Sequence, residues 1–259
     1  MKDEKISVLM CVFNGSKTIK ESIQSILDQT YTNFEFVIVD DGSSDNTFDI
    51  IHECSLKDHR IKLYRKSNEG LTKSLNYGLK LCSGKYIARQ DADDISCRER
   101  LEKSLYNLTE KKLDLLTTRY LRFNSDGNIN IRPHSFFTSN AFSLELLEYG
   151  NLHAHGSFFF DRKIIDNGLR YDESFKTAQD FDFLIAIIKL GYKCHIINDC
   201  LYHLRIDDYS ISNRNRGSQN NNAKEILIKH NLNDKLTLGA SRYSKAISFS
   251  KKLLLNFKL

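Results

Sequence analysis

Short apolar runs alternate with amphipathic stretches through the first 94 residues, and this alternation constrains the fold more than any other feature of the chain. The runs at 6–13 and 34–40 are apolar on both faces, which is typical of parallel strands buried between helices. Between them, isoleucine and leucine recur at i, i+4, i+7 and i+8 over residues 19–27, the spacing of one helix face. With further strand signals at 61–65 and 84–89, the pattern predicts an α/β fold with a largely parallel sheet flanked by helices.

Acidic residues follow two of these strands directly. Asp40 and Asp41 end the second strand, while Asp91, Asp93 and Asp94 come straight after the fourth. Ligands of parallel sheets bind outside the carboxyl ends of the strands, so both clusters are expected at one crevice. For either cluster alone a solvated turn is an equally good interpretation, since acids favour turns. The two clusters on one edge together favour a ligand site.

The chain has no glycine-rich loop that could hold phosphate through backbone N–H groups. Neither GxGxxG nor GxxxxGK with a following Ser or Thr occurs after any of these strands. A phosphorylated ligand at the acidic edge would therefore need a cation to neutralise it. Carboxylate oxygens are hard ligands, so Mg²⁺ or Mn²⁺ is the expected metal.

The composition argues against several classes of protein. A net charge of +5, from 38 basic and 33 acidic residues, is too small to indicate nucleic-acid binding. The six cysteines form no CxxC pair and fit neither a zinc nor a disulfide framework, so reduced thiols are expected. The N-terminus shows no signal-peptide pattern, and no apolar run approaches the ~20 residues that span a bilayer. A cytoplasmic protein is the resulting expectation.

Four stretches resemble, in order, the family 2 nucleotide-sugar glycosyltransferases, inverting enzymes with the GT-A fold, and especially the bacterial members that build surface polysaccharide. They are ISVLMCVFNG, SILDQTYTNFEFVIVDDGSSDNT, NEGLTKSLNYGLKLCSGKYIARQDADD and YDESFKTAQDFDFLIAI, and the resemblance covers about residues 5–212. It implies a GT-A-type Rossmann-like mixed, mostly parallel sheet flanked by helices, with a C-terminal helical extension. The organisation we expect is a nucleotide-sugar-binding half at 1–95, an acceptor-binding and catalytic half at 96–212, and a linker with a basic amphipathic tail at 213–259.

In this family the end of the first strand and the VDDGS motif form the nucleoside site. Carried over, Cys11, Val12 and Phe13 would line the base pocket, and Asp40 would support the turn after the second strand. Asp41 would accept a hydrogen bond from N3–H of the base. A carboxylate only accepts, so it favours uracil or thymine over cytosine, and the implied donor is a UDP- or dTDP-sugar. Many relatives have Pro, Ser or Thr in place of Cys11, where backbone groups can serve instead.

The DAD sequence matches the metal motif of the family. Asp93 would ligate Mn²⁺ or Mg²⁺ directly, and Asp91 would contact the ribose or a metal-bound water. Asn68 and Gly70 would help to wall the nucleotide site. Arg89 would point toward that site, although a structural ion pair is an equally good interpretation of this residue.

Asp180 is the candidate catalytic base. It lies near the start of an expected helix over 177–191, where the family has its base. The alternative interpretation is a helix N-cap, a position that favours Asp. Relatives usually have Glu–Asp where this chain has Gln179–Asp180, and the lost charge bears on the pKa of the base.

Two other stretches of the second half carry residues that could bind a metal. A strand is expected over 153–162, with His153 and His155 in the core or beside the acceptor in preference to a metal pair. Asp207 stands where relatives often have a His, and whether it approaches the metal stays open.

The tail differs in composition from the rest. Residues 213–225 are polar and indicate a linker, while 241–259 mixes five basic residues with apolar ones and has no acid. A basic amphipathic segment can bind an anionic membrane surface, which would place the protein peripherally on the inner face of the plasma membrane. A terminal helix packed on the domain is the alternative.

The sequence thus predicts a metal-dependent inverting glycosyltransferase that moves a sugar to a hydroxyl of a glycan acceptor, expected to be lipid-linked. A non-catalytic nucleotide- or glycan-binding module with the same fold is the alternative, and the joint presence of Asp41, Asp93 and Asp180 argues against it. A nucleotidyltransferase would want a basic, glycine-rich loop after the first strand, where only Lys17 is present. The donor sugar, the linkage and the oligomeric state depend on loop shapes that the sequence does not give.

Overall fold

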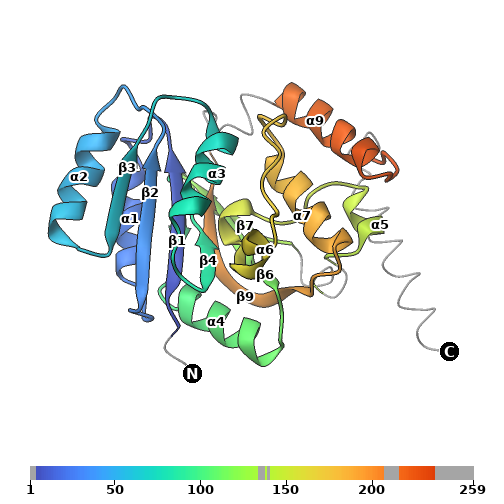
Figure 1. Ribbon diagram of the computed structural model, residues 1–259, viewed down its shortest axis with the longest axis horizontal. Coiled ribbons are helices and arrows are strands. Elements are labelled where there is room, and N and C mark those ends of the chain that lie inside the picture. Colours follow the sequence, from blue (N-terminus) through green and yellow to red (C-terminus); the bar gives the residue numbers. More distant parts are fainter. Residues whose placement is uncertain (1–3, 134–137, 139–140, 207–215, 237–259) are drawn as a thin grey trace.

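The computed structural model describes residues 4–133, 138, 141–206 and 216–236, which form an α/β fold around one continuous sheet (Figure 1). The strands are β1 (Ile6–Val12), β2 (Phe34–Asp40), β3 (Ile61–Arg65), β4 (Tyr86–Arg89), β5 (Ile95–Ser96), β6 (Leu115–Asn124), β7 (Gly127–Arg132), β8 (Phe159–Asp161) and β9 (Cys194–Arg205). The helices are α1 (Ile19–Leu27), α2 (Thr47–Lys57), α3 (Leu71–Leu81), α4 (Arg100–Glu110), α5 (Leu144–Leu147), the 3-10 helix η2 (His155–Ser157), α6 (Lys163–Asp166), α7 (Gln179–Lys189) and α9 (Arg216–Lys229). In this described part of the chain, no helix is long and apolar enough to cross a membrane.

The strand order is β3-β2-β1-β4-β8-β6-β9-β5, with β7 paired to β6. β1 pairs in parallel with β2 and β4, and β2 pairs in parallel with β3, so these four strands form the predicted parallel unit. β8 is antiparallel to both β4 and β6, whereas β9 is parallel to β6. The predicted fold class, a mixed sheet with a parallel first half flanked by helices, is confirmed.

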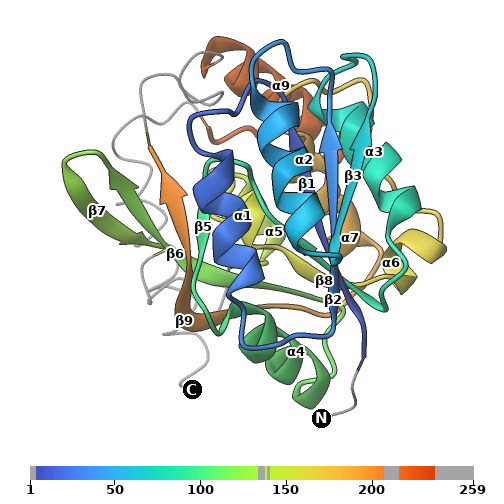
Figure 2. The same cartoon turned by 90° about the vertical axis from the view of Figure 1, so that its left-hand side faces the viewer.

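Strand β1 is apolar throughout because helices cover both faces of the sheet at this point. Leu9 and Cys11 belong to the core that contains Leu75 of α3, while Val8 and Met10 belong to the core formed with α1 and α2. Figure 2 shows α1 and α2 on one side of β1 and β2, and α3 on the other. Burying each large apolar side chain contributes roughly 1.5–3 kcal/mol, and successive residues of one strand do so on opposite faces.

The stretch 153–162 is not the single strand that the sequence indicated. Only Phe159–Asp161 forms a strand, β8, and the turn of 3-10 helix η2 precedes it. The Ser157 N–H donates to Ala154 O at 3.0 Å, and the Ser157 hydroxyl donates to the same oxygen at 2.7 Å. These two bonds close a turn at a place where the sequence pattern predicted an extended strand.

The polar run after residue 215 is a helix, α9, and not the linker that its composition indicated. Ile226 and Leu227 are fully buried in the core that α7 also lines. The Asn222 side chain donates to Thr177 Oγ1 at 2.9 Å, just before α7 begins. Two adjacent apolar residues and a few polar anchors therefore suffice to dock a helix whose other faces are polar. The predicted basic tail at 241–259 lies outside the described residues.

Candidate active site

The carboxylate of Asp41 organises the end of β2 and the loop that leads from β3 into α3. Asp41 Oδ1 accepts from Lys66 Nζ at 2.9 Å and from the Glu69 N–H at 3.1 Å, and Oδ2 accepts from the Gly70 N–H at 2.9 Å. Burial raises the pKa of Asp41, but these bonds outweigh it and the pKa lies below its usual value. Asp41 is therefore a carboxylate that lies against Gly70, its predicted neighbour in the nucleotide site.

The neighbouring residues of the predicted base pocket differ in exposure. Cys11 and Val12 are buried, whereas the Phe13 side chain is 51% exposed and its ring can stack on a planar ligand. Burial raises the pKa of the Cys11 thiol to about 12, so this cysteine is inert. Asp40 Oδ1 accepts from the Ser43 N–H at 3.1 Å, which is the turn-supporting bond expected of it.

At the end of β4, the buried guanidinium of Arg89 holds Asp91. Arg89 Nη2 donates to Asp91 Oδ1 at 2.6 Å, and Nη1 donates to Leu9 O at 2.6 Å. The Arg89 Nε lies 3.4 Å from His155 Nε2. The structure thus contains the structural ion pair, and contact between Arg89 and a nucleotide stays a prediction, as it does for the exposed Asn68.

Strand β9 fixes the rest of the acidic turn. The Arg205 N–H donates to Asp94 Oδ1 at 2.7 Å, and Arg205 Nε donates to Asp93 O at 2.8 Å. The Tyr202 hydroxyl donates to Asp94 Oδ2 at 2.8 Å. Burial raises the pKa of Asp94 well above its usual value, and the charges of Asp93 and Asp91 raise it further. Asp94 is therefore a buried support, while Asp91 and Asp93 are partly exposed.

The side chains of Asp91 and Asp93 fit a hard divalent cation in chemical type. No group of three or more His, Cys, Asp and Glu side chains among the described residues is arranged to hold a metal ion by itself. Mg²⁺ is commonly held by only one or two carboxylates together with substrate phosphates, so a metal at this turn would need the diphosphate as a co-ligand. Asp207 lies outside the described residues.

Asp180 lies in the first turn of α7, and its environment suits a general base. The N-cap of α7 is Ala178, so the interpretation of Asp180 as an N-cap is wrong. Asp180 Oδ2 accepts from Asn151 Nδ2 at 2.8 Å. Burial raises the pKa of Asp180 to about 6, and the charge of Asp91 contributes to the rise. The base candidate and the acidic turn, 89 residues apart in sequence, are therefore close enough in space for their charges to interact.

The other candidate side chains of the second half have structural partners. His153 is buried between Thr117 Oγ1 and Ala141 O, as a core histidine. His155 Nε2 lies 2.8 Å from the Tyr171 hydroxyl. Asp182 Oδ1 accepts from Lys229 Nζ at 2.7 Å and His230 Nε2 at 2.8 Å, which anchors α9 to α7.

Sequence reasoning missed several buried or half-buried polar residues that support this site. Arg100 Nη2 donates to Arg89 O at 2.6 Å and to Gly156 O at 2.7 Å, so it joins α4, β4 and η2 beneath the acidic turn. Asn151, Tyr202 and Arg205 were missed as well. Each of these residues has partners that are distant in sequence. Only for Tyr202 did the sequence indicate burial, through the apolar residues around it.

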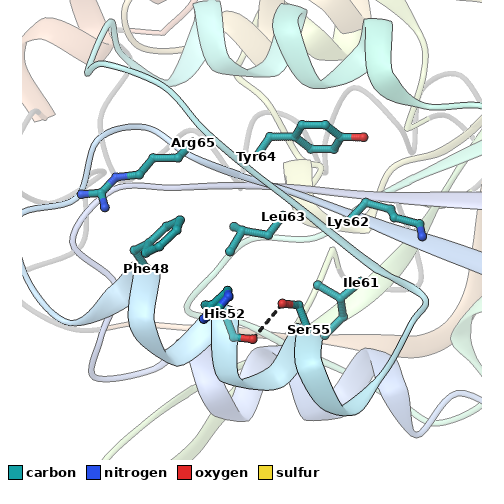
Figure 3. Close-up of a pocket in the computed structure, with 8 residues that line it drawn as sticks. All are labelled: Phe48, His52, Ser55, Ile61, Lys62, Leu63, Tyr64 and Arg65. Carbon is teal, nitrogen blue, oxygen red and sulfur yellow. Dashed lines mark hydrogen bonds between the residues drawn. The ribbon is translucent and has the colours of Figure 1, made fainter.

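A separate hollow of about 470 Å³ lies between α2 and the edge strand β3 (Figure 3). The Arg65 guanidinium sits 4.5 Å above the Phe48 ring within it, and His52, Ser55 and Tyr64 add to the lining. None of the acidic residues described above lines this hollow, so it is not part of the candidate site.

This combination of fold and site defines a glycosyltransferase of the GT-A class. The sequence profile described as Glycosyl transferase family 2 matches residues 7–169. An uncharacterized glycosyltransferase of Haemophilus influenzae is 30% identical over 85% of this chain and 71% of its own length. The O-antigen biosynthesis glycosyltransferase WbnJ of Escherichia coli is 30% identical over 80% of this chain and 82% of its own. The chain belongs to glycosyl transferase family 2.

Two solved structures share the fold. Staphylococcus aureus TarS 1-349 in complex with UDP-GlcNAc has a TM-score of 0.70 and 22% identity, over 98% of this chain and 76% of the other. The mannosyltransferase PcManGT of Pyrobaculum calidifontis, in complex with GDP-Man and Mn²⁺, has a TM-score of 0.69 and 16% identity, over 98% and 79%. At these identities the likeness concerns the fold alone.

Proposed function

We propose that this glycosyltransferase is a metal-dependent, inverting enzyme that transfers a sugar from a UDP- or dTDP-sugar to a hydroxyl of a lipid-linked glycan in surface-polysaccharide synthesis. The observation that carries the proposal is the position of Asp180, a partly exposed carboxylate whose pKa is raised to about 6 beside the acidic turn. The name of the E. coli relative and the UDP-GlcNAc complex of TarS support the pathway and the donor class. The Mn²⁺ in PcManGT supports the metal.

The donor side of the reaction rests on the strand ends. The base would stack on Phe13 and donate its N3–H to Asp41, whose position is fixed by Lys66 and the loop amides. Asp93 would hold Mn²⁺ or Mg²⁺, and Asp91 would contact the ribose or a metal-bound water. When bound, the metal neutralises the diphosphate and so stabilises the leaving group.

The acceptor side rests on Asp180. A carboxylate with a pKa of about 6 is largely ionised at neutral pH and still a stronger base than an ordinary Asp. Asp180 would take the proton from the acceptor hydroxyl as the hydroxyl oxygen attacks the anomeric carbon. Attack on the face opposite the leaving diphosphate inverts the configuration.

Substitution of Asp180 by Asn tests this role. Asn keeps the shape but cannot take the proton, so turnover should fall by roughly 10²–10⁴-fold while donor affinity is kept. Asp182→Asn, two residues along the same helix, is the matched control: it should lower stability through its Lys229 and His230 contacts and keep turnover. Near-normal turnover in Asp180→Asn would remove this residue from the mechanism.

The alternative, a non-catalytic module of the same fold, predicts donor binding without product. Release of nucleoside diphosphate in the presence of metal and an acceptor glycan separates the two functions. We also propose a cytoplasmic location with peripheral attachment to the inner face of the plasma membrane through 241–259, which rests on sequence alone.

A further inference from the structure

Asn151 lies between the candidate base and a backbone segment that is held from two sides. Its Nδ2 donates to Asp180 Oδ2 at 2.8 Å, and its Oδ1 accepts from the His153 N–H at 2.9 Å. The two bonds use both ends of one amide. No motif in the sequence includes this residue, and the reaction proposed for Asp180 does not require it.

The second bond fixes which end of the Asn151 amide faces Asp180. A backbone N–H can only donate, so the atom beside His153 N has to be the amide oxygen. The NH₂ group must then point toward Asp180, where it meets an acceptor. Rotation of the amide by half a turn would bring a donor against a donor and an oxygen against a carboxylate, so one orientation is strongly preferred.

The side chain of His153 holds this segment in place. Its Nε2 lies 2.9 Å from Ala141 O, which only accepts, so Nε2 carries the proton. Its Nδ1 then accepts from the Thr117 hydroxyl at 2.8 Å. Burial lowers the pKa of His153 to about 4, so the imidazole stays neutral and keeps both bonds at neutral pH. Strand β6, through Thr117, therefore supports the backbone that orients Asn151.

We propose that Asn151 is a positioning residue for the catalytic base: it holds Asp180 through Oδ2 and so orients the carboxylate toward the acceptor's proton. This inference rests on the proposed function of Asp180 and adds to it the residue that orients and tunes the base. A donor aimed at a carboxylate stabilises the ionised form, which lowers the pKa of that carboxylate.

The other groups around Asp180 act in both directions, and the backbone N–H of Phe181 lowers its pKa more than any other group does. Burial raises its pKa most, and the charge of Asp91 from the acidic turn raises it further. The charge of Asp180 also raises the pKa of the buried Tyr171 hydroxyl, which lies in the loop before α7. Asn151 is the side chain that lowers the pKa of Asp180, and it does so together with the N–H groups of the first helical turn.

The test is the pH dependence of turnover, measured on the full-length protein with saturating UDP-sugar and Mn²⁺ from about pH 5 to about pH 9. The base must be ionised to act, so activity is lost as the pH falls through its pKa. Asn151→Ala removes the donor and should move this acid limb upward by about one pH unit. The turnover at neutral pH should fall about tenfold with little change in donor KM.

Two further variants separate positioning from general support. Asn151→Asp can still accept from the His153 N–H but places a carboxylate against Asp180, so the acid limb should move upward further than in Asn151→Ala. Asn233→Ala removes a similar bond, Asn233 Nδ2 to Glu148 Oε1 at 2.8 Å, from a carboxylate outside the site. It should lower stability and leave the acid limb where it is.

An acid limb that stays in place in both Asn151 variants, or that moves equally in Asn233→Ala, would overturn the proposal. Loss of folding in Asn151→Ala would do so too, because it would assign Asn151 a structural role. A failure of the proposed function looks different, since Asp180→Asn would then retain turnover. If Asp180→Asn is inactive and the acid limb still does not move, only the role of Asn151 is wrong.

Discussion

The guanidinium of Arg89 donates to the carboxylate of Asp91 at 2.6 Å from a position with no solvent exposure. Asp93 and Asp94 follow within three residues, so this pair places one positive charge among three carboxylates. Arg89 also donates to Leu9 O and Gln90 O, which ties the acidic turn to strand β1. A buried guanidinium beneath the turn therefore offsets part of its negative charge.

Replacement of Arg89 by Lys should destabilise the protein, because one ammonium group cannot reach the acceptors that the planar guanidinium serves. We expect the free energy of unfolding to fall by about 3 kcal/mol, the scale for breaking a buried ion pair. Arg60→Lys is the matched control, since its pair with Asp58 is partly exposed and should cost less than about 1 kcal/mol. Urea denaturation of both variants measures the difference, and equal losses would contradict a special role for Arg89.

Much of the first half of the site could be predicted because local signals and strand order act together there. Apolar runs located β1 and β2, and the parallel order then placed Asp41 and Asp91 at the same edge. The supports of the second half could not be found in this way. Asn151 meets Asp180 across 29 residues, and Tyr202 meets Asp94 across 108, so neither pair leaves a periodic signal.

Helix α9 shows a different limit of sequence reasoning. Its composition is that of a linker, and its order comes from Ile226 and Leu227 against α7 with ion pairs from Lys229 to Asp172 and Asp182. Tertiary contacts of this kind override local composition, and periodicity cannot reveal them when only two adjacent residues are buried.

Substitution of Asp93 by Asn should weaken metal-dependent donor binding while the protein stays folded. Asn keeps the shape of the side chain and removes the charge that would attract Mn²⁺ or Mg²⁺. Calorimetry with UDP-sugar, with and without metal, should show that the gain in affinity on adding metal is largely lost. Asp126→Asn, on the exposed β6–β7 turn, is the control and should keep that gain. Full transfer activity in excess chelator would disprove metal dependence.

The buried His153 should make stability depend on pH. Its pKa is lowered to about 4 in the folded protein, against ~6.5 in the unfolded chain. Between these values the unfolded chain binds a proton that the folded protein does not, so stability is complete above about pH 6.5 and falls as the pH drops toward 4. His153→Gln does not titrate, and urea denaturation at several pH values should show roughly 3 kcal/mol less pH dependence than in the wild type. If the wild type and His153→Gln showed the same dependence of stability on pH, folding would not lower the pKa of His153.

Deletion of residues 241–259 should release the protein from anionic vesicles and leave its thermal stability unchanged. The segment holds five basic residues and no acid, and each basic residue near such a surface contributes ~1 kcal/mol. A variant with the five basic residues changed to Gln separates charge from apolar insertion and should also release the protein. Unchanged sedimentation with vesicles, or a large fall in melting temperature on deletion, would favour a helix packed on the domain.

Substitution of Gly156 by Ala should distort the acidic turn. A Cβ at this position would lie 1.7 Å from the Tyr202 hydroxyl and 2.9 Å from Asp91 Oδ2. Tyr202 is fully buried and bonded to Asp94, so its ring cannot move aside without breaking the support of the turn. We expect a loss of about 3 kcal/mol in stability, the upper range for overpacking, together with weaker binding of donor and metal.

Gly217→Ala provides the control for that substitution. Gly217 lies in α9 and an added Cβ would meet no atom within 4 Å, so Ala should be neutral or should stabilise the helix by up to about 1 kcal/mol. Urea denaturation and donor calorimetry on both variants give the comparison. If Gly156→Ala kept both stability and donor affinity, then the contact between η2 and Tyr202 would not be what holds Asp91 and Asp94 in place. The arrangement of the acidic turn would instead have to depend on Arg89 and Arg205 alone.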